Sequence, residues 1–200
     1  NLYLYILFSL IVSMNYSVCN SFFYRSFRTL ILSYKTRRNS YAASQFFYRF
    51  VIYNYSGEVL ETISGDGKIP AGGRTFLYSA DAQENFQDIQ KVDLEFKGVK
   101  WEKSEGVSRF NLISEILGTE VNESGTKVSG VIKNGGSLAA RDIKILATIS
   151  DKFGQEFFAS QTIVSNLNGF EEKNFSVYFP FDSEFMEKID PTATKIYLAW

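Results

Sequence analysis

The sequence contains no histidine among its 200 residues and only one cysteine, Cys19. Without histidine the chain lacks the commonest general base and the commonest zinc and copper ligand, and it can form neither a Ser-His nor a Cys-His nucleophile pair. A single cysteine cannot form an intramolecular disulfide, so packing alone must hold the structure together. Most familiar catalytic and metal sites are therefore excluded, and we expect no enzyme, no catalytic residue, no cofactor and no metal site.

Acidic residues are absent from positions 1–57, which carry six of the 21 basic residues. These six are Arg25, Arg28, Lys35, Arg37, Arg38 and Arg49. The later part of the chain holds all 22 acidic side chains and is strongly acidic overall. Because nucleic-acid binding needs Lys and Arg clustered against phosphates, we expect no nucleic acid as a partner.

Glycine and proline are also missing from residues 1–56, and residues 2–14 form an apolar run. A transmembrane helix needs about 20 mainly apolar residues, so this run is long enough only if the more polar stretch through Tyr24 is included. It lacks the basic start of a signal peptide, and Val18 is not the small residue expected before a lipid-bearing cysteine. Residues 1–44 are interpreted as an apolar and basic leader, either a helical membrane anchor or a non-native segment translated out of frame.

From Gln45 onward the hydrophobic residues recur with a period close to two, and aromatic and β-branched residues are abundant, which favours strands. Strands are predicted at 127–133, 142–150, 156–164, 174–179 and 195–200, with glycine-containing turns between several of them. In 142–150 the apolar positions are Ile143, Ile145, Ala147 and Ile149, which predicts a strand with one buried face. Several short strands at this spacing predict an all-β sandwich, with Ile145 and Phe175 in its core and Lys144 outside.

An earlier segment repeats this order at a separation of about 100 residues, which favours tandem domains. Its strands are predicted at 50–54, 59–63, 75–79 and 91–96, matching 147–151, 156–164, 175–179 and 195–200. The predicted domains are a partial copy at 45–101 and a complete copy at 102–200. Half a sandwich exposes its apolar face at a cost of about 25 cal/mol per Å². We therefore expect one of three arrangements for the first copy: the leader supplies substitute strands, the first copy packs on the second, or the first copy is incomplete as given.

Each copy has an acidic connector before its last strand, at 81–89 and 182–190. The second predicts a short helix with Phe185, Met186 and Ile189 on one face and Pro191 after its end. The alternative of calcium binding lacks the regular spacing of a calcium loop.

Other motifs favour a structural interpretation over a catalytic one. Gly65-Asp66-Gly67 and Ala71-Gly72-Gly73 are predicted as hairpin turns, because no Lys-Ser or Lys-Thr pair and helix follow them as in a phosphate loop. The paired carboxylates, Glu171 with Glu172 and Asp182 with Glu184, are interpreted as solvated loop charges. The sequons at Asn122 and Asn174 matter only in a source that glycosylates them.

Three short motifs resemble the FxLYD domain. They are a strand ending in Asn (Val131-Ile132-Lys133-Asn134), a strand ending in Asp before a glycine turn (Ile149-Ser150-Asp151 with Gly154), and the turn Leu167-Asn168-Gly169. In the first copy, Phe50-Val51-Ile52-Tyr53-Asn54 keeps the Phe, aliphatic and Tyr positions and replaces Asp by Asn. The resemblance covers residues 46–200 and implies an immunoglobulin-like or fibronectin-like β-sandwich, similar to the late-embryogenesis-abundant sandwich.

The same resemblance implies a bacterial, membrane-anchored protein without catalytic residues. Location outside the cytoplasm rests on the resemblance alone, since the basic leader would favour the cytoplasmic side. We expect a non-enzymatic, extracytoplasmic structural or protein-interaction module of the cell envelope, with the membrane contacted through the leader and an envelope protein as partner. The alternatives are a stress-protective sandwich and a hydrolase accessory domain.

Overall fold

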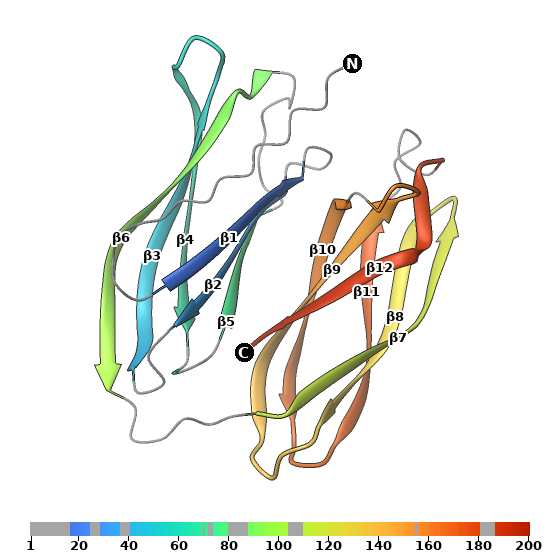
Figure 1. Cartoon of the computed structure of the whole chain (residues 1–200). Helices are drawn as coiled ribbons and strands as arrows, with labels where there is room; N and C mark the ends of the chain where they lie inside the picture. Colours follow the sequence, from blue (N-terminus) through green and yellow to red (C-terminus); the bar gives the residue numbers. More distant parts are fainter. Residues whose placement is uncertain are drawn as a thin grey trace. The chain divides into compact units, whose positions relative to one another are not determined.

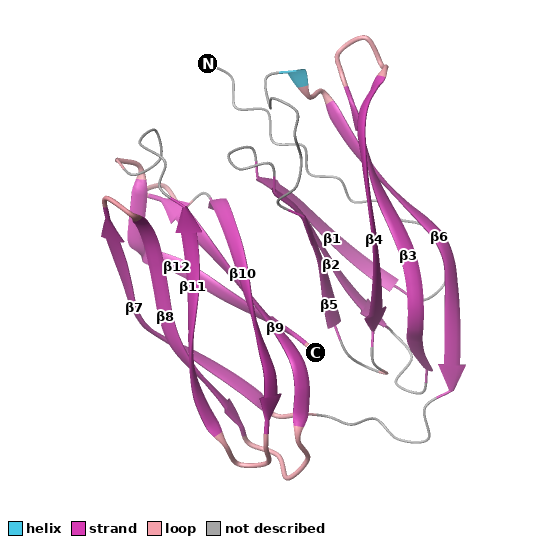
Figure 2. Cartoon of the chain, turned by 180° about the vertical axis from the view of Figure 1, so that it is seen from behind, coloured by secondary structure: helices cyan, strands magenta, loops and turns pink. Residues whose placement is uncertain are grey.

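The computed structural model describes residues 17–24, 29–36, 41–69, 71, 74–79, 88–103, 110–154, 156–180 and 187–200. In these ranges the protein is all β, with twelve strands and no α-helix (Figure 1). The short piece coloured as helix in Figure 2 is 3₁₀ structure before β6. The chain divides into two compact units, Asn1–Val107 and Ser108–Trp200, called unit 1 and unit 2 below.

Unit 2 consists of two antiparallel sheets of three strands each. The strands are β7 (Leu112–Asn122), β8 (Gly125–Asn134), β9 (Ala140–Asp151), β10 (Glu156–Leu167), β11 (Glu172–Pro180) and β12 (Ile189–Ala199). One sheet has the order β11-β8-β7 and the other β10-β9-β12. The five strands predicted from the sequence for this unit are confirmed, and β7 is a strand that the sequence prediction missed.

The core of unit 2 lies between these two sheets. On β9, the side chains of Ile143, Ile145 and Ile149 are all 0% exposed. On β11, Phe175, Val177 and Phe179 are buried while the residues between them are more exposed, as period-two alternation requires. Full burial of one such side chain contributes about 1.5–3 kcal/mol, so the apolar alternation drives the two sheets together. The predicted core positions of Ile145 and Phe175 are confirmed.

Side-chain bonds join the two sheets of unit 2 along their edges. Ser160 Oγ on β10 donates to the Tyr178 carbonyl on β11 at 2.7 Å. The hydroxyls of Thr119 on β7 and Thr194 on β12 lie 3.1 Å apart. These two hydrogen bonds link β10 to β11 and β7 to β12, so side-chain bonds connect the two sheets at both long edges of the sandwich.

Strand β9 departs from the predicted pattern of one buried face. Leu146, Thr148 and Ser150, which alternate with the core residues, are also buried, at 2%, 1% and 0% exposure. Because β9 is the central strand, flanking side chains of β10 and β12 can cover its outer face, which a single-strand pattern does not reveal. The prediction of a strand with one buried face is wrong for residues 145–150.

The described part of unit 1 forms six strands that pair in the same order as those of unit 2. They are β1 (Ser17–Tyr24), β2 (Thr29–Thr36), β3 (Tyr41–Tyr53), β4 (Val59–Ile69), β5 (Arg74–Ser79) and β6 (Lys91–Lys103). The sheet β4-β3-β6 corresponds to β10-β9-β12, and β1-β2-β5 corresponds to β7-β8-β11. The four strands that the repeat predicted in this unit are confirmed.

The leader supplies two of these strands. Residues 17–24 form β1 and residues 29–36 form β2, which pairs with β5. The helical interpretation of the leader is therefore wrong for these residues, and of the alternatives raised for the first copy the structure shows substitute strands. The apolar run 2–14 lies outside the described residues. Among those described, no helix has the length and hydropathy needed to cross a membrane.

Phe46 and Tyr48 on β3 explain two glycines in the neighbouring strand. A Cβ on Gly65 would lie 2.5 Å from Tyr48 Cζ, and a Cβ on Gly67 would lie 2.6 Å from Phe46 Cζ. Both rings therefore lie directly over glycine backbone, where any side chain would clash. Gly65-Asp66-Gly67 is part of β4, so the predicted hairpin turn is wrong, and no helix follows as a phosphate loop would require. Of the second glycine stretch only Ala71, in a turn, is described.

The predicted helix before the last strand is wrong at its C-terminal end. Ile189 begins β12, is 7% exposed and pairs with Asp151, while Pro191 lies inside the same strand. The pairing shifts between Asp190 and Lys195, which accommodates a proline that has no N–H to donate. Residues 182–186 of the predicted helix lie outside the described part.

Candidate interaction site

The first hairpin of the β4-β3-β6 sheet and that of β10-β9-β12 use the same local bonds. In unit 2, Asp151 Oδ1 accepts from Phe153 N at 2.8 Å, and Gly154 N donates to the Asp151 carbonyl at 2.9 Å. In unit 1, Asn54 Oδ1 accepts from Ser56 N at 2.9 Å, and Gly57 N donates to the Asn54 carbonyl at 3.1 Å.

Both hairpin glycines have a left-handed φ, 79° at position 154 and 81° at position 57. Glycine adopts this conformation without steric cost, whereas other residues do not. The Asp and Asn at the ends of the repeated strands are therefore turn formers, and no ligand role is needed to explain them.

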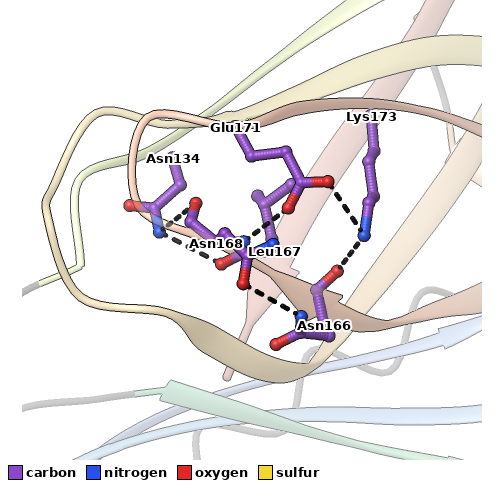
Figure 3. A network of polar contacts seen from close by, with 6 residues as sticks. All are labelled: Asn134, Asn166, Leu167, Asn168, Glu171 and Lys173. Atoms are coloured by element: carbon purple, nitrogen blue, oxygen red, sulfur yellow. Dashed lines mark hydrogen bonds and ion pairs between the residues drawn. The ribbon is translucent and has the colours of Figure 1, made fainter.

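At the opposite end of β9, the side chain of Asn134 connects the β8–β9 loop to the β10–β11 loop; Figure 3 shows its bonds to the second of these. Its amide nitrogen Nδ2 donates to the carbonyls of Leu138 at 2.7 Å, Asn168 at 3.1 Å and Leu167 at 3.2 Å. Its Oδ1 accepts from Gly136 N at 3.0 Å. Since Asn134 is 0% exposed, these bonds satisfy an amide that would otherwise be costly to bury. We call this set of contacts the Asn134 clasp.

Glu171 and Lys173 extend the clasp to the β10–β11 loop (Figure 3). Glu171 Oε2 accepts from Asn168 N at 2.6 Å, and Glu171 Oε1 lies 3.2 Å from Lys173 Nζ. Lys173 Nζ also donates to the Asn166 carbonyl at 2.7 Å. The hydrogen bond from Asn168, followed by the bond and charge of Lys173, holds the pKa of Glu171 below its usual value. Glu171 is thus a solvent-accessible loop charge, as interpreted from the sequence, and it is also a hydrogen-bond acceptor within its loop.

Phe170 occupies a strained position in this loop. Glu171 N donates to the Asn168 carbonyl at 3.2 Å, closing a four-residue turn whose third residue, Phe170, has a φ of 62°. Glycine or asparagine normally takes such a position. The turn's glycine is instead Gly169, where a Cβ would lie 2.3 Å from the Ser137 carbonyl oxygen. Because the two loops approach so closely, only glycine fits at position 169. The left-handed position of the turn is therefore occupied by Phe170.

Two large apolar side chains are exposed where these loops meet. Phe170 is 71% exposed and Leu138 is 59% exposed. Their loops are held together by the hydrogen bond from Phe170 N to the Gly136 carbonyl at 3.0 Å and by the bond from Asn134 to Leu138. We call Leu138 and Phe170 the apolar tip. An aromatic and an aliphatic group displayed on a clasped loop pair can serve as anchors for another protein.

A second polar cluster lies on the outer face of the β10-β9-β12 sheet. Glu156 Oε1 lies 2.5 Å from Lys195 Nζ and accepts from the Tyr197 hydroxyl at 3.1 Å. Burial, and then the charge of Glu156, raise the pKa of Tyr197 to about 12. Tyr197 therefore stays protonated and donates a hydrogen bond to Glu156 across β9. The chemistry of the cluster is that of a cross-strand support.

The other residues singled out from the sequence do not gather into a site. Glu172 is exposed on β11, and the pair Asp182 and Glu184 lies outside the described residues. In the described ranges no three His, Cys, Asp or Glu side chains are placed to hold a metal ion. The sequence pattern identified Asn134 and Leu167-Asn168-Gly169 as turn markers but missed Leu138 and Phe170. The available signal was a large apolar residue close to a turn glycine, directly after Gly169 in one loop and two residues after Gly136 in the other.

The fold and this geometry define an all-β protein of sandwich-like units with a clasped loop end on unit 2. No family model matches the chain, and no curated protein matches it. The resemblance to the FxLYD domain therefore stays a prediction carried by short motifs. The residues of two of those motifs, Asn134 and Leu167-Asn168-Gly169, are the ones that bond to each other in the clasp.

Proposed function

We propose that the chain is a non-enzymatic protein-interaction module in which an immunoglobulin-like unit 2 presents the apolar tip to a partner protein. The observation that carries the proposal is the strained and exposed Phe170, with a φ of 62° and 71% exposure. An aromatic side chain gains nothing for folding in such a place. Strain of about 1–3 kcal/mol tends to persist where a site requires it, and here the clasp enforces it.

The clasp supports a binding role because it fixes the tip before a partner arrives. Association costs about 0.5–1.5 kcal/mol for each mobile side chain that must be ordered, and disordered loops cost more. The hydrogen bonds of Asn134 and Glu171 hold both tip loops in one arrangement. Binding energy is then not spent on ordering the loops, so two apolar anchors can suffice for a specific contact.

The proposed setting is the cell envelope, with the chain tethered outside the cytoplasm. This part of the proposal is supported by the FxLYD resemblance and by the apolar run at residues 2–14. The immunoglobulin-like assignment is supported by two antiparallel sheets facing each other across an apolar core. The acidic character of residues 58–200 suits a basic rim on the partner, which would raise the rate of association.

The test is affinity capture from envelope extract with three forms of the intact chain. The forms are the natural chain, the double variant Leu138→Ser and Phe170→Ser, and the control Phe153→Ser. Phe153 is 95% exposed in the hairpin at the other end of β9, so the control removes an equally accessible phenylalanine away from the tip. A captured protein counts only after purification and measurement of its affinity for each form.

We expect a partner whose Kd rises at least about tenfold in the double variant and stays unchanged in the control. A partner that binds all three forms equally, or the absence of any protein that depends on the tip, would refute the proposal. Protection of a client enzyme during drying by all three forms alike would instead favour the stress-protective alternative.

A further inference from the structure

The chain contains Asn-Gly pairs at 134–135 and 168–169, and both lie in unit 2. Asparagine is among the thermolabile residues, and glycine after it leaves the backbone nitrogen unhindered for attack on the side-chain amide. In an unfolded chain the two pairs are chemically alike. The folded structure places them in opposite environments.

The first pair is locked by hydrogen bonds. Gly135 N, the nitrogen that would attack, donates to the Asn111 carbonyl at 2.7 Å. The Asn134 amide is fully buried, and both its nitrogen and its oxygen are engaged in the clasp. Attack would require these bonds to break together in a site that excludes water.

The second pair is open to attack. Asn168 is exposed, and its Oδ1 accepts from Asn166 Nδ2 at 3.2 Å, which polarises the amide carbonyl toward a nucleophile (Figure 3). Among the backbone bonds of the described residues, Gly169 N donates to no acceptor, whereas Gly135 N is bonded to Asn111. The attacking nitrogen is therefore free of the kind of backbone bond that holds Gly135 N, and it lies beside an exposed asparagine.

We propose that Asn168 is a site of spontaneous deamidation and that Asn134 is protected from the same reaction. Gly169 N loses its proton to solvent and forms a bond to Asn168 Cγ. The bond from Cγ to Nδ2 breaks, and ammonia leaves with the proton it needs, giving a five-membered cyclic imide. Water then adds to one of the two imide carbonyls and opens the ring to aspartate or to isoaspartate. No oxidant or reductant takes part.

Either product disturbs the clasp. Aspartate at position 168 adds a negative charge close to Glu171, whose carboxylate accepts the Asn168 N–H. Isoaspartate lengthens the backbone by one carbon next to Gly169, which already touches the Ser137 backbone too closely for a Cβ. The reaction thereby loosens the loop that displays Phe170. Only this last consequence, a weaker tip with age, rests on the proposed function.

The intact chain is stored at mildly alkaline pH and 37 °C for a time on the order of days to weeks. Both Asn-Gly pairs are then examined by peptide mapping with mass spectrometry. A second sample is stored in urea, where the structure is lost. We expect conversion at Asn168 to exceed that at Asn134 by at least about tenfold in the folded chain, and the two rates to converge in urea. Equal rates in the folded chain, faster reaction at Asn134, or no reaction at Asn168 would overturn the proposal.

Asn168→Gln is the matched control, because its longer side chain cannot form the five-membered ring while it keeps an amide at the same position. Stored natural chain is expected to unfold at lower urea concentration than fresh chain, and stored Asn168→Gln is expected to match its fresh sample. An equal loss in both stored chains would place the damage elsewhere and refute the effect on the clasp. Because the readouts are mass and stability, they stand whether or not the tip binds a partner.

Discussion

Replacing Asn134 by alanine tests the clasp directly. The Nδ2 group has two hydrogens, so one bonds to the Leu138 carbonyl at 2.7 Å and the other is shared between those of Leu167 and Asn168. With the bond accepted by Oδ1, about three effective hydrogen bonds are lost, each contributing about 1 kcal/mol. The Leu167 carbonyl, whose bond to Asn134 is buried, is also left without this donor. The expected loss of stability of unit 2 is about 3–4 kcal/mol.

The assay is urea unfolding followed by tryptophan fluorescence. The chain has two tryptophans, Trp101 in unit 1 and Trp200 in unit 2, so a Trp101→Phe background makes the signal report unit 2. With a denaturant slope of about 1–3 kcal/mol per molar urea, a loss of about 3 kcal/mol lowers the midpoint by about 1–3 M.

The matched control is Asn174→Ala, which removes an exposed asparagine from β11 of the same unit. Its expected effect is within about 0.5 kcal/mol. Asn134→Asp should be at least as damaging as Asn134→Ala, because a carboxylate cannot donate to the carbonyls and places a negative charge against them. If Asn134→Ala costs no more than the control, the hydrogen bonds of Asn134 do not hold the loops and the reasoning fails.

Three further predictions concern the same unit. Phe175→Ala should lower the free energy of unfolding by about 3–5 kcal/mol, because Phe175 is 6% exposed. Phe153→Ala should lower it by less than about 0.5 kcal/mol, because Phe153 is 95% exposed. Equal urea midpoints for the two variants would contradict the assigned register. Phe170→Gly should raise stability by about 0.5–1 kcal/mol by relieving the left-handed φ, and a loss would show that the phenyl ring packs after all. The lowered pKa of folded Glu171 stabilises the folded chain at pH values above its unfolded pKa of about 4.3. The difference in free energy of unfolding between the natural chain and Glu171→Gln should therefore shrink as the pH falls below 4. A constant difference from pH 7 to pH 3 would refute the role of the carboxylate.

Strands with one apolar face could be predicted from the sequence, because burial of alternate side chains requires apolar and polar residues to alternate along the chain. Phe175, Val177 and Phe179 alternate with exposed neighbours, and β11 was recognised from them. The missed strand β7 is different, since it lies at a sheet edge and exposes Ile113 at 56% and Leu117 at 64%. Its apolar residues do not mark its buried face, so period-two counting has little to detect.

Glycine was the residue most easily misread. At positions 57 and 154 it marks a turn because the backbone needs a left-handed φ. At positions 65 and 67 it marks a strand because aromatic rings of β3 occupy the space of a side chain. The sequence near each glycine is similar in both cases, and the deciding neighbour is a ring on another strand. Local sequence cannot show that neighbour.

The candidate site was hidden for the same reason. Asn134 and the turn Leu167-Asn168-Gly169 were each visible as loop signals, but 33 residues separate Asn134 from Leu167, and only the pairing of β8 with β11 brings them together. The exposed Leu138 and Phe170 belong to no periodic pattern, because residues in loops do not alternate between the two faces of a sheet. Their significance depends on the clasp beneath them, which is a tertiary feature.

The two units share their strand order and one of their hairpins. The hairpin after the central strand is built alike in both, by Asn54 with Gly57 and by Asp151 with Gly154. Strand β8 ends in Asn134, whose side-chain amide joins the carbonyls of Leu138, Leu167 and Asn168. A hairpin turn serves any unit of this topology, so it is the same in both. The Asn134 clasp and the exposed Leu138 and Phe170 lie at the other end of unit 2, which is why the proposed interaction is assigned to that end and not to the repeated hairpin.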